Sequence, residues 1–138
     1  MSDQAERTRR VVIADDDDDI RGLMTIAAKR AGVEIVAAVD NGQAALEAVR
    51  GGGVDLVVLD ISMPGLNGVE VAGAIRADER TQSTLILMVS ASVQLLTDHG
   101  VVAERADSFL VKPFSPRALS TRIREMLQLD AQRVEESA

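Results

Sequence analysis

Aspartate stands at the end of two aliphatic segments of this chain, and lysine stands at the end of a third. The segment VVIA runs into Asp15 and Asp16, and the segment VVL runs into Asp60. The segment FLV runs into Lys112. If these segments are neighbouring strands of a parallel sheet, their carboxyl ends meet at one edge of the sheet. Three carboxylates and one ammonium would then lie close together.

Carboxylates at such distances repel one another. At about 4 Å and an effective dielectric constant of about 20, each pair costs roughly 4 kcal/mol. A fold keeps this arrangement only if a cation or a proton neutralises part of the charge, so the sequence predicts a metal site. A fourth apolar segment runs into Ser90, which adds a hydroxyl at the same edge. This set of groups suits a divalent metal and a phosphoryl group.

The elements that must position these residues alternate along the chain. Apolar runs predict strands at Arg10–Ala14, Glu34–Val39, 55–59, 84–89 and Ser108–Val111. Apolar residues at helical spacing predict helices at Asp18–Ala31, Gly42–Arg50, 68–77, 93–105 and 116–129. Strand–helix pairs with short connections indicate an α/β protein with a doubly wound parallel sheet and helices on both of its faces.

Polar residues and glycine mark the predicted helix ends. Asp18 or Asp19 is expected to cap the first helix, and Gly32 is expected to end it. Asn67 and Ser115 are expected to cap the third and the last helix. Proline at the first position of the last helix agrees with that boundary.

Composition excludes several classes of protein. The 138 residues suit one domain, and the formal charge of -7 argues against a nucleic-acid surface. There is no cysteine, which excludes disulfides and a thiolate zinc site. No apolar run approaches the roughly 20 residues of a membrane span, and the first residues are too polar for a signal peptide. We expect a cytoplasmic protein that contacts neither nucleic acid nor membrane.

In its motifs the chain resembles the receiver domain of bacterial two-component response regulators. The motifs VVIADDDDDIR, VVLDISMPGLNG and SFLVKPF carry the resemblance, with Ser90 correctly placed between the last two. The resemblance covers roughly residues 10–129, and it leaves a flexible N-terminal tail at 1–9 and a C-terminal tail at 130–138. It implies a flavodoxin-like (βα)5 fold with the strand order 2-1-3-4-5.

The resemblance also implies a magnesium site. Asp16 and Asp60 would bind Mg²⁺ directly, together with the backbone carbonyl of Ser62. Asp15 would hold a coordinated water. Mg²⁺ prefers one or two carboxylates, water and a phosphate in an octahedron, which agrees with this set.

For the reaction, the resemblance implies that Asp60 takes a phosphoryl group from a phosphohistidine. The donor would be a histidine kinase or a histidine phosphotransfer protein. Ser90 and Lys112 would contact the phosphoryl oxygens, with lysine acting as a point charge. A cis peptide is expected at Lys112–Pro113, because cis bonds occur essentially only before proline. Side chains at Ser62 and Ser92 are expected to influence the lifetime of the aspartyl phosphate.

The resemblance indicates a single-domain response regulator rather than an enzyme, since it would catalyse only its own phosphorylation and dephosphorylation. No further domain is expected, because residues 130–138 are few and polar. Phosphorylation would switch the face formed by residues 93–105, Ser108–Val111 and the last helix. The downstream effector protein is unknown, and the chain is expected to be a monomer or a phosphorylation-dependent dimer. The alternatives are a receiver module cut from a larger regulator and a phosphorylation-independent scaffold.

Two other classes of protein are excluded because residues that they require at fixed positions are missing from this sequence. A phosphatase of the haloacid dehalogenase type needs a second aspartate two residues after the nucleophile, where this chain has Ser62. An EF-hand calcium loop that begins at Asp15 would need glycine at its sixth position and glutamate at its twelfth. Those positions are Ile20 and Ile26.

Two helices carry further expectations. The helix at 93–105 contains Gly100, which costs about 1 kcal/mol relative to alanine, and it ends in Arg105 where the family commonly has glycine. That helix is therefore expected to be loose or irregular. On the first helix, Ile20, Leu23 and Met24 are expected to be partly exposed and to receive the phosphoryl donor.

Overall fold

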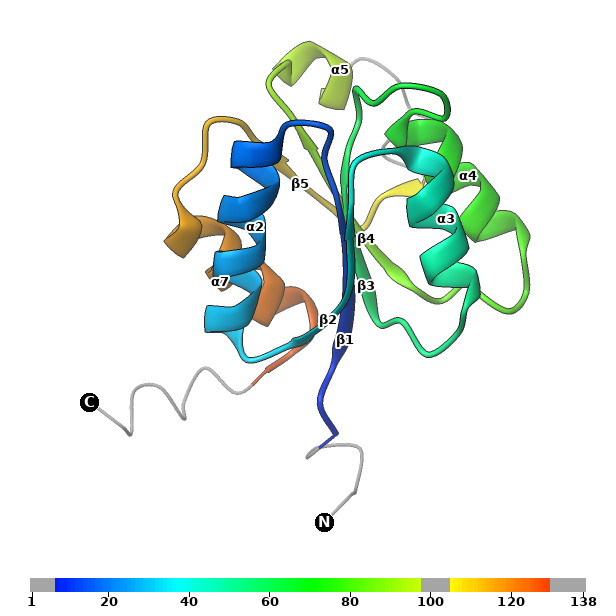
Figure 1. The fold of residues 1–138 in the computed structure, drawn as a ribbon, viewed down its shortest axis with the longest axis horizontal. Helices are drawn as coiled ribbons and strands as arrows, with labels where there is room; N and C mark the ends of the chain where they lie inside the picture. Colours follow the sequence, from blue (N-terminus) through cyan, green and yellow to red (C-terminus); the bar gives the residue numbers. More distant parts are fainter. Residues whose placement is uncertain (1–6, 98–104, 130–138) are drawn as a thin grey trace.

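The computed structural model describes residues 7–97 and 105–129, and the structural statements below concern these residues. Five parallel strands form one sheet in the order β2-β1-β3-β4-β5 (Figure 1). The strands are β1 (Arg10–Ala14), β2 (Glu34–Val39), β3 (Leu56–Asp60), β4 (Leu85–Ser90) and β5 (Ser108–Val111). The helices are α2 (Asp18–Ala31), α3 (Gly42–Arg50), α4 (Gly68–Ala77), α5 (Val93–Thr97) and α7 (Pro116–Met126). The predicted fold class and strand order are confirmed.

The sheet lies between two layers of helices (Figure 1). Side chains alternate between the two faces of each strand, so β1 sends Val11 and Ile13 to one face and Val12 and Ala14 to the other. One face packs against α2 and α7, and the other packs against α3 and α4. Both cores are aliphatic, with Phe109 packed at the margin of the α3 and α4 core. Strands covered on both faces explain the nearly continuous apolar runs in the sequence.

Two strands begin and end one residue later than predicted. They run from Leu56 to Asp60 and from Leu85 to Ser90, so Asp60 and Ser90 are the last residues of β3 and β4. Asp55 was predicted to begin β3, but its carboxylate accepts hydrogen bonds from the Arg7 side chain and the Arg10 backbone before the strand starts. The boundaries of the domain and of its tails stay a prediction.

The cap of α2 is Asp17, so the prediction of Asp18 or Asp19 was wrong. Asp17 is the last residue with extended backbone, and its side chain accepts from the N–H groups of Asp19 and Ile20 at 2.9 and 3.1 Å. Gly32 ends α2 with a φ of 87°, which favours glycine. The predicted caps of α4 and α7 are confirmed, because Asn67 forms a capping box and the Ser115 side chain accepts from the backbone of α7.

The helices near the carboxyl end differ from the predicted lengths. The last helix ends at Met126 rather than near residue 129. The helix predicted at 93–105 is described as α5 up to Thr97, and Gly100 lies outside the described residues. Arg105 lies against α4, where its Nη1 donates to the Val69 carbonyl at 3.2 Å. In the described part of the chain, no helix is long and apolar enough to cross a membrane.

Glycine at the start of α4 lets that helix begin directly against the end of β3. The Gly68 N–H donates to the Ile61 carbonyl at 2.8 Å. A Cβ at Gly68 would lie 2.6 Å from the Asp60 carbonyl oxygen and 2.9 Å from the Ile61 Cα. Both contacts are with backbone, so relief would require moving the strand end that carries Asp60.

We therefore expect Gly68→Ala to lower the free energy of unfolding by about 1–3 kcal/mol, as overpacking does. Gly22→Ala is the matched control, because Gly22 lies within α2 and a Cβ there meets nothing within 4 Å. It should raise stability by up to about 1 kcal/mol through helix propensity. Urea unfolding followed by circular dichroism measures both, and equal stabilities for the two variants would contradict the close approach at Gly68.

Candidate functional site

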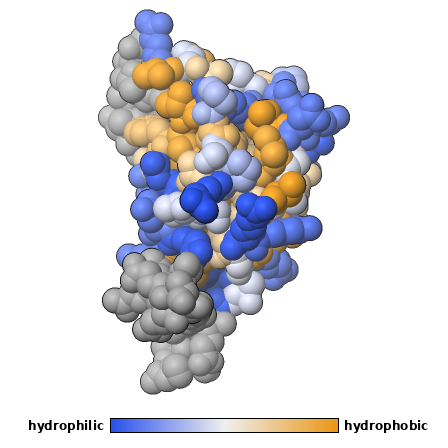
Figure 2. Space-filling view, turned by 90° about the vertical axis from the view of Figure 1, so that its left-hand side faces the viewer, coloured by the Kyte–Doolittle hydropathy of each residue, from blue (hydrophilic) through white to orange (hydrophobic). Residues whose placement is uncertain are grey.

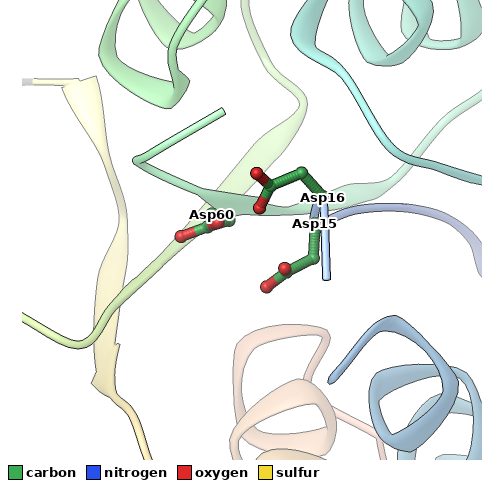
Figure 3. A group of neighbouring side chains, drawn as sticks. All are labelled: Asp15, Asp16 and Asp60. Carbon is green, nitrogen blue, oxygen red and sulfur yellow. The ribbon is translucent and has the colours of Figure 1, made fainter. Parts of the chain in front are cut away.

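The predicted carboxylates meet at the carboxyl edge of the sheet. Each of Asp15, Asp16 and Asp60 offers an oxygen, and these atoms lie within 4.8 Å of one another. Pairing of β1 with β3 aligns Ala14 with Leu59, which places the residues that follow side by side. Figure 3 shows Asp15 and Asp16 leaving successive positions beyond β1, with their carboxylates turned to the side on which Asp60 lies.

Asp15 is completely buried, and most of its polar atoms have partners. Its backbone N–H donates to the Val39 carbonyl at 3.1 Å, and its Oδ1 accepts from the Asp17 N–H at 2.9 Å. Its Oδ2 lies 2.7 Å from Lys112 Nζ. No donor among the described residues reaches that oxygen with hydrogen-bond geometry. Among the described groups, this buried oxygen is therefore neutralised by the ion pair with Lys112.

Lys112 comes from the end of β5 and brings its ammonium between two carboxylates. Nζ lies 2.7 Å from Asp15 Oδ2 and 3.5 Å from Asp60 Oδ1. The backbone N–H of Lys112 donates to the Ser90 carbonyl at 2.9 Å, and the following peptide bond is cis, as expected. Burial lowers the pKa of Lys112, but its close pairing with Asp15 and the charge of Asp60 outweigh burial and raise it. The side chain therefore stays an ammonium at neutral pH.

The Asp60 carboxyl lies in an environment that disfavours its charge. Only 4% of the residue is exposed. Burial and then repulsion from Asp15 raise the pKa of Asp60 from 3.8 to about 6, although Lys112 acts in the opposite direction. The Ser62 N–H lies 3.4 Å from Asp60 Oδ1 and also favours the charged form. A bound cation would complete the neutralisation that Lys112 begins.

Ser90 adds a buried hydroxyl beside these charges. Only 2% of the residue is exposed, and its Oγ accepts from the Ser92 N–H at 3.0 Å. The Ser92 Oγ in turn accepts from the Leu95 N–H of α5 at 3.2 Å. Because the Ser90 oxygen is used as an acceptor, its own O–H remains available to donate to a ligand.

These groups line one hollow at the sheet edge, with a volume of about 360 Å³. Its lining residues are Asp16, Asp17, Asp60, Ser62, Ser90, Ala91, Ser92, Leu95 and Lys112. All the predicted site residues line it or, in the case of Asp15, contact it through Lys112. A larger, shallow hollow of about 740 Å³ lies at the end of α4, and the acidic cluster found among the described residues is not part of its lining. Its Asp78 is paired with Arg80 at 2.8 Å.

The donor set fits a hard divalent cation. All three acidic side chains offer oxygen, and the described site contains no imidazole or thiolate ligand that would favour zinc or copper.

Arg21 contacts this site and was missed by the sequence analysis. Its Nη1 donates to the Asp15 carbonyl at 3.0 Å, and its Nη2 donates to Asp18 Oδ1 at 2.6 Å. The only signal was an arginine in the first turns of the helix that follows the aspartate run. From that turn the side chain can reach back to the end of β1. The sequence could not identify its partner, because several aspartates lie within reach of Arg21.

The raised pKa of Asp60 predicts that its carboxyl destabilises the metal-free protein at neutral pH. Because the folded pKa of about 6 exceeds the ordinary value of 3.8, the contribution of this group is most favourable below about pH 4. It is lost as the pH rises through about 6. Asp60→Asn should raise the free energy of unfolding at pH 7.5 by on the order of 1–3 kcal/mol, with a smaller gain at pH 4.5. Urea unfolding with EDTA measures this.

Asp78→Asn is the control with the opposite sign. The side-chain hydrogen bond from Arg80 lowers the pKa of Asp78 to about 2. This carboxylate therefore contributes stability above its ordinary pKa, and that stability is lost as the pH falls through about 2. Its removal should lower the free energy of unfolding at pH 7.5. An Asp60→Asn protein no more stable than the wild type at pH 7.5 would contradict the electrostatic explanation.

Comparisons with known proteins agree with this geometry. The family model of the response regulator receiver domain matches residues 11–124. CheY, a chemotaxis protein of Pseudomonas aeruginosa, is 31% identical over 121 residues, which cover 86% of this chain and 96% of CheY. MtrA, a DNA-binding response regulator of Mycobacterium tuberculosis, is 32% identical over 120 residues, which cover 87% of this chain and 51% of MtrA. The chain thus spans about half the length of MtrA.

A solved structure with the same fold contains a metal. The response regulator TrrA of Thermotoga maritima, in complex with Mg²⁺ and BeF, superimposes with a TM-score of 0.76 at 33% identity. The match covers 86% of this chain and 99% of the TrrA chain. From its sequence, its fold and its acidic cluster, the chain belongs to the response regulator receiver domain family, whose members are phosphoryl-accepting signalling modules.

Proposed function

We propose that this chain is a Mg²⁺-dependent switch of a two-component phosphorelay, with Asp60 as the phosphoryl acceptor. One observation carries the proposal: Asp60 is a buried carboxylate that shares one edge with two other carboxylates and the Lys112 ammonium. That set provides a nucleophile, a cation site and a positive charge within one hollow. Family membership and the Mg²⁺–BeF complex of TrrA support the same role.

The metal would be held directly by Asp16, Asp60 and the backbone carbonyl of Ser62, and Asp15 would hold a water coordinated to it. Bound there, Mg²⁺ would supply positive charge to the equatorial oxygens of the phosphoryl group. The charge of this set supports the assignment, because three carboxylates exceed what one ammonium can neutralise.

The protein's own residues would position the transfer. An oxygen of Asp60 attacks the phosphorus of a phosphohistidine, and the P–N bond to the donor imidazole breaks as the new O–P bond forms. Lys112 Nζ, already 3.5 Å from Asp60 Oδ1, would pair with one phosphoryl oxygen. The free Ser90 O–H would donate to another. The product is an aspartyl phosphate, so the chain would act on its own side chain and not on a released substrate.

Phosphorylation would be transmitted through Ser90. Its Oγ accepts from Ser92, and Ser92 in turn accepts from the first turn of α5. If Ser90 turns to donate to a phosphoryl oxygen, this short chain of hydrogen bonds carries the change to α5. The expected result is a shift between two existing states of the face formed by α5, β5 and α7.

The partners follow from this role. The donor would be a histidine kinase or a histidine phosphotransfer protein, and the receiver of the signal would be an effector protein. We propose a single-domain role, which is supported by the match to CheY over 96% of CheY. The cytoplasmic location and the dependence of the aspartyl phosphate lifetime on Ser62 and Ser92 stay predictions.

The donor is proposed to dock on α2, where two apolar side chains face solvent. Leu23 is 38% exposed and Ile26 is 47% exposed. Met24 was expected to share this surface, but the prediction was wrong because Met24 packs completely against the sheet. Figure 2 looks onto the side that carries α2 and α7, and it shows apolar patches separated by hydrophilic residues.

The phosphoryl acceptor can be tested by intact mass after incubation with acetyl phosphate and Mg²⁺. The chain contains no tryptophan, so mass is a better measurement than fluorescence quenching. We expect one phosphoryl adduct that requires Mg²⁺ and is absent from Asp60→Asn. Asp19→Asn, on the exposed side of the aspartate run, serves as the control and should still form the adduct. An adduct that persists in Asp60→Asn would place the acceptor elsewhere.

If the donor docks on α2, substitutions there should slow phosphoryl transfer from a protein donor but not from acetyl phosphate. Replacing both Leu23 and Ile26 with alanine should slow transfer from a phosphorylated histidine phosphotransfer domain about tenfold, because buried apolar anchors dominate interface energies. The rate with acetyl phosphate should stay within about twofold, since the reacting groups are untouched. An unchanged rate with the protein donor would exclude this surface, and an equal loss with both donors would indicate damage to the site itself.

A further inference from the structure

Asp16 differs from the other two carboxylates in how it is held. Asp15 and Asp60 are buried, whereas Asp16 is exposed. In residues 7–97 and 105–129, no side chain or backbone group donates a hydrogen bond to the Asp16 carboxylate. Its position in the cluster therefore depends on the backbone that precedes it.

That backbone is the peptide between Asp15 and Asp16. A peptide unit is planar, so the direction of the Asp15 carbonyl also sets the direction of the Asp16 N–H and Cα. Before this unit, the Asp15 N–H donates a hydrogen bond to the Val39 carbonyl of the neighbouring strand at 3.1 Å. Within the unit, the Asp15 carbonyl accepts from Arg21 Nη1 at 3.0 Å. Fixing the carbonyl therefore fixes the start of Asp16.

The Arg21 guanidinium makes a second hydrogen bond in addition to the one with the Asp15 carbonyl. Its Nη2 donates to Asp18 Oδ1 at 2.6 Å, and its side chain is only 22% exposed. The hydrogen bond to Asp18 raises the pKa of Arg21, and the charges of Asp40 and Asp15 add to this against the effect of desolvation. The guanidinium thus joins the first turn of α2 to the end of β1 with two donors in a fixed, planar arrangement.

We propose that Arg21 is a positioning residue for the metal site, acting through the Asp15 carbonyl to hold Asp16 beside Asp15 and Asp60. The inference rests on the proposed Mg²⁺ site. Lys112 fixes the side chain of Asp15 and Arg21 fixes its carbonyl, so the two cations act on different atoms of one residue.

Charge and position predict opposite effects of removing Arg21. As a charge alone, a nearby cation repels Mg²⁺, so its removal would strengthen metal binding. As a positioning group, it holds a metal ligand in place, and its removal would weaken binding. Groups that orient the ligands of a metal typically change its affinity by about 10- to 100-fold. The sign of the change in affinity therefore distinguishes the two roles.

The test is a calorimetric titration of Mg²⁺ alone into the unphosphorylated chain, with no phosphoryl donor present. We expect Arg21→Gln to weaken Mg²⁺ binding by about tenfold or more. Arg21→Lys keeps the charge but cannot bridge both acceptors, so its affinity should lie between those of Arg21→Gln and the wild type. Arg30→Gln removes the same charge from the exposed end of α2 and should stay within about twofold of the wild type at 0.15 M salt.

Amide exchange of Asp17 in the metal-free proteins provides a second measurement, because the Asp17 N–H donates to Asp15 Oδ1 at 2.9 Å. Loss of the guanidinium that holds Asp15 should make the Asp17 N–H exchange faster, whereas amides of β3 should keep their protection. Circular dichroism shows whether each variant is folded. If Arg21→Gln is unfolded, the Mg²⁺ affinity of Arg21→Lys decides between the two roles. Affinity in a folded Arg21 variant equal to or above that of the wild type overturns the positioning role. A wild-type chain that binds no Mg²⁺ overturns the proposed metal site, and the role of Arg21 with it.

Discussion

The structure depends on holding carboxylates together against their mutual repulsion. Asp15 and Asp60 are both buried at one edge of the sheet, and Lys112 offers them a single ammonium. At about 4 Å and an effective dielectric constant of about 20, such a pair repels by roughly 4 kcal/mol. The pKa of Asp60, raised to about 6, reflects that environment. A divalent cation would remove the repulsion, so the same charges that weaken the metal-free protein favour binding.

The sheet supplies the rigidity that this arrangement needs. The strands β1, β3 and β4 are packed on both faces by two separate aliphatic cores, which fixes their register. Because side chains alternate between faces, a slip of one residue would exchange the contents of the two cores. The pairing of Ala14 with Leu59 is therefore strongly determined, and it places Asp15 next to Asp60. Gly68 adds to this by allowing α4 to begin directly against the strand end.

The fold and the acidic cluster were predictable because their signals are local and repeated along the chain. Continuous apolar runs identified the strands, and polar residues at their ends identified the edge at which the cluster forms. The cap of α2 was mispredicted because five successive aspartates are chemically equivalent, and only the backbone conformation distinguishes Asp17. The burial of Met24 and the contact of Arg21 with Asp15 depend on how α2 is rotated about its axis against the sheet. That rotation is a tertiary property, set by packing against both β1 and α7.

The serine hydrogen bonds beyond β4 would also transmit a change from α5 back to the phosphoryl site. Ser90 is oriented by the backbone of Ser92, and Ser92 caps the first turn of α5. If phosphorylation shifts α5 as proposed, a protein that binds the shifted arrangement of α5 favours phosphorylation by the same free energy, because coupling between two sites is reciprocal. An effector bound to α5 would then be more than a reader of the signal. Its abundance would help to set how much of the chain is phosphorylated at a given supply of donor.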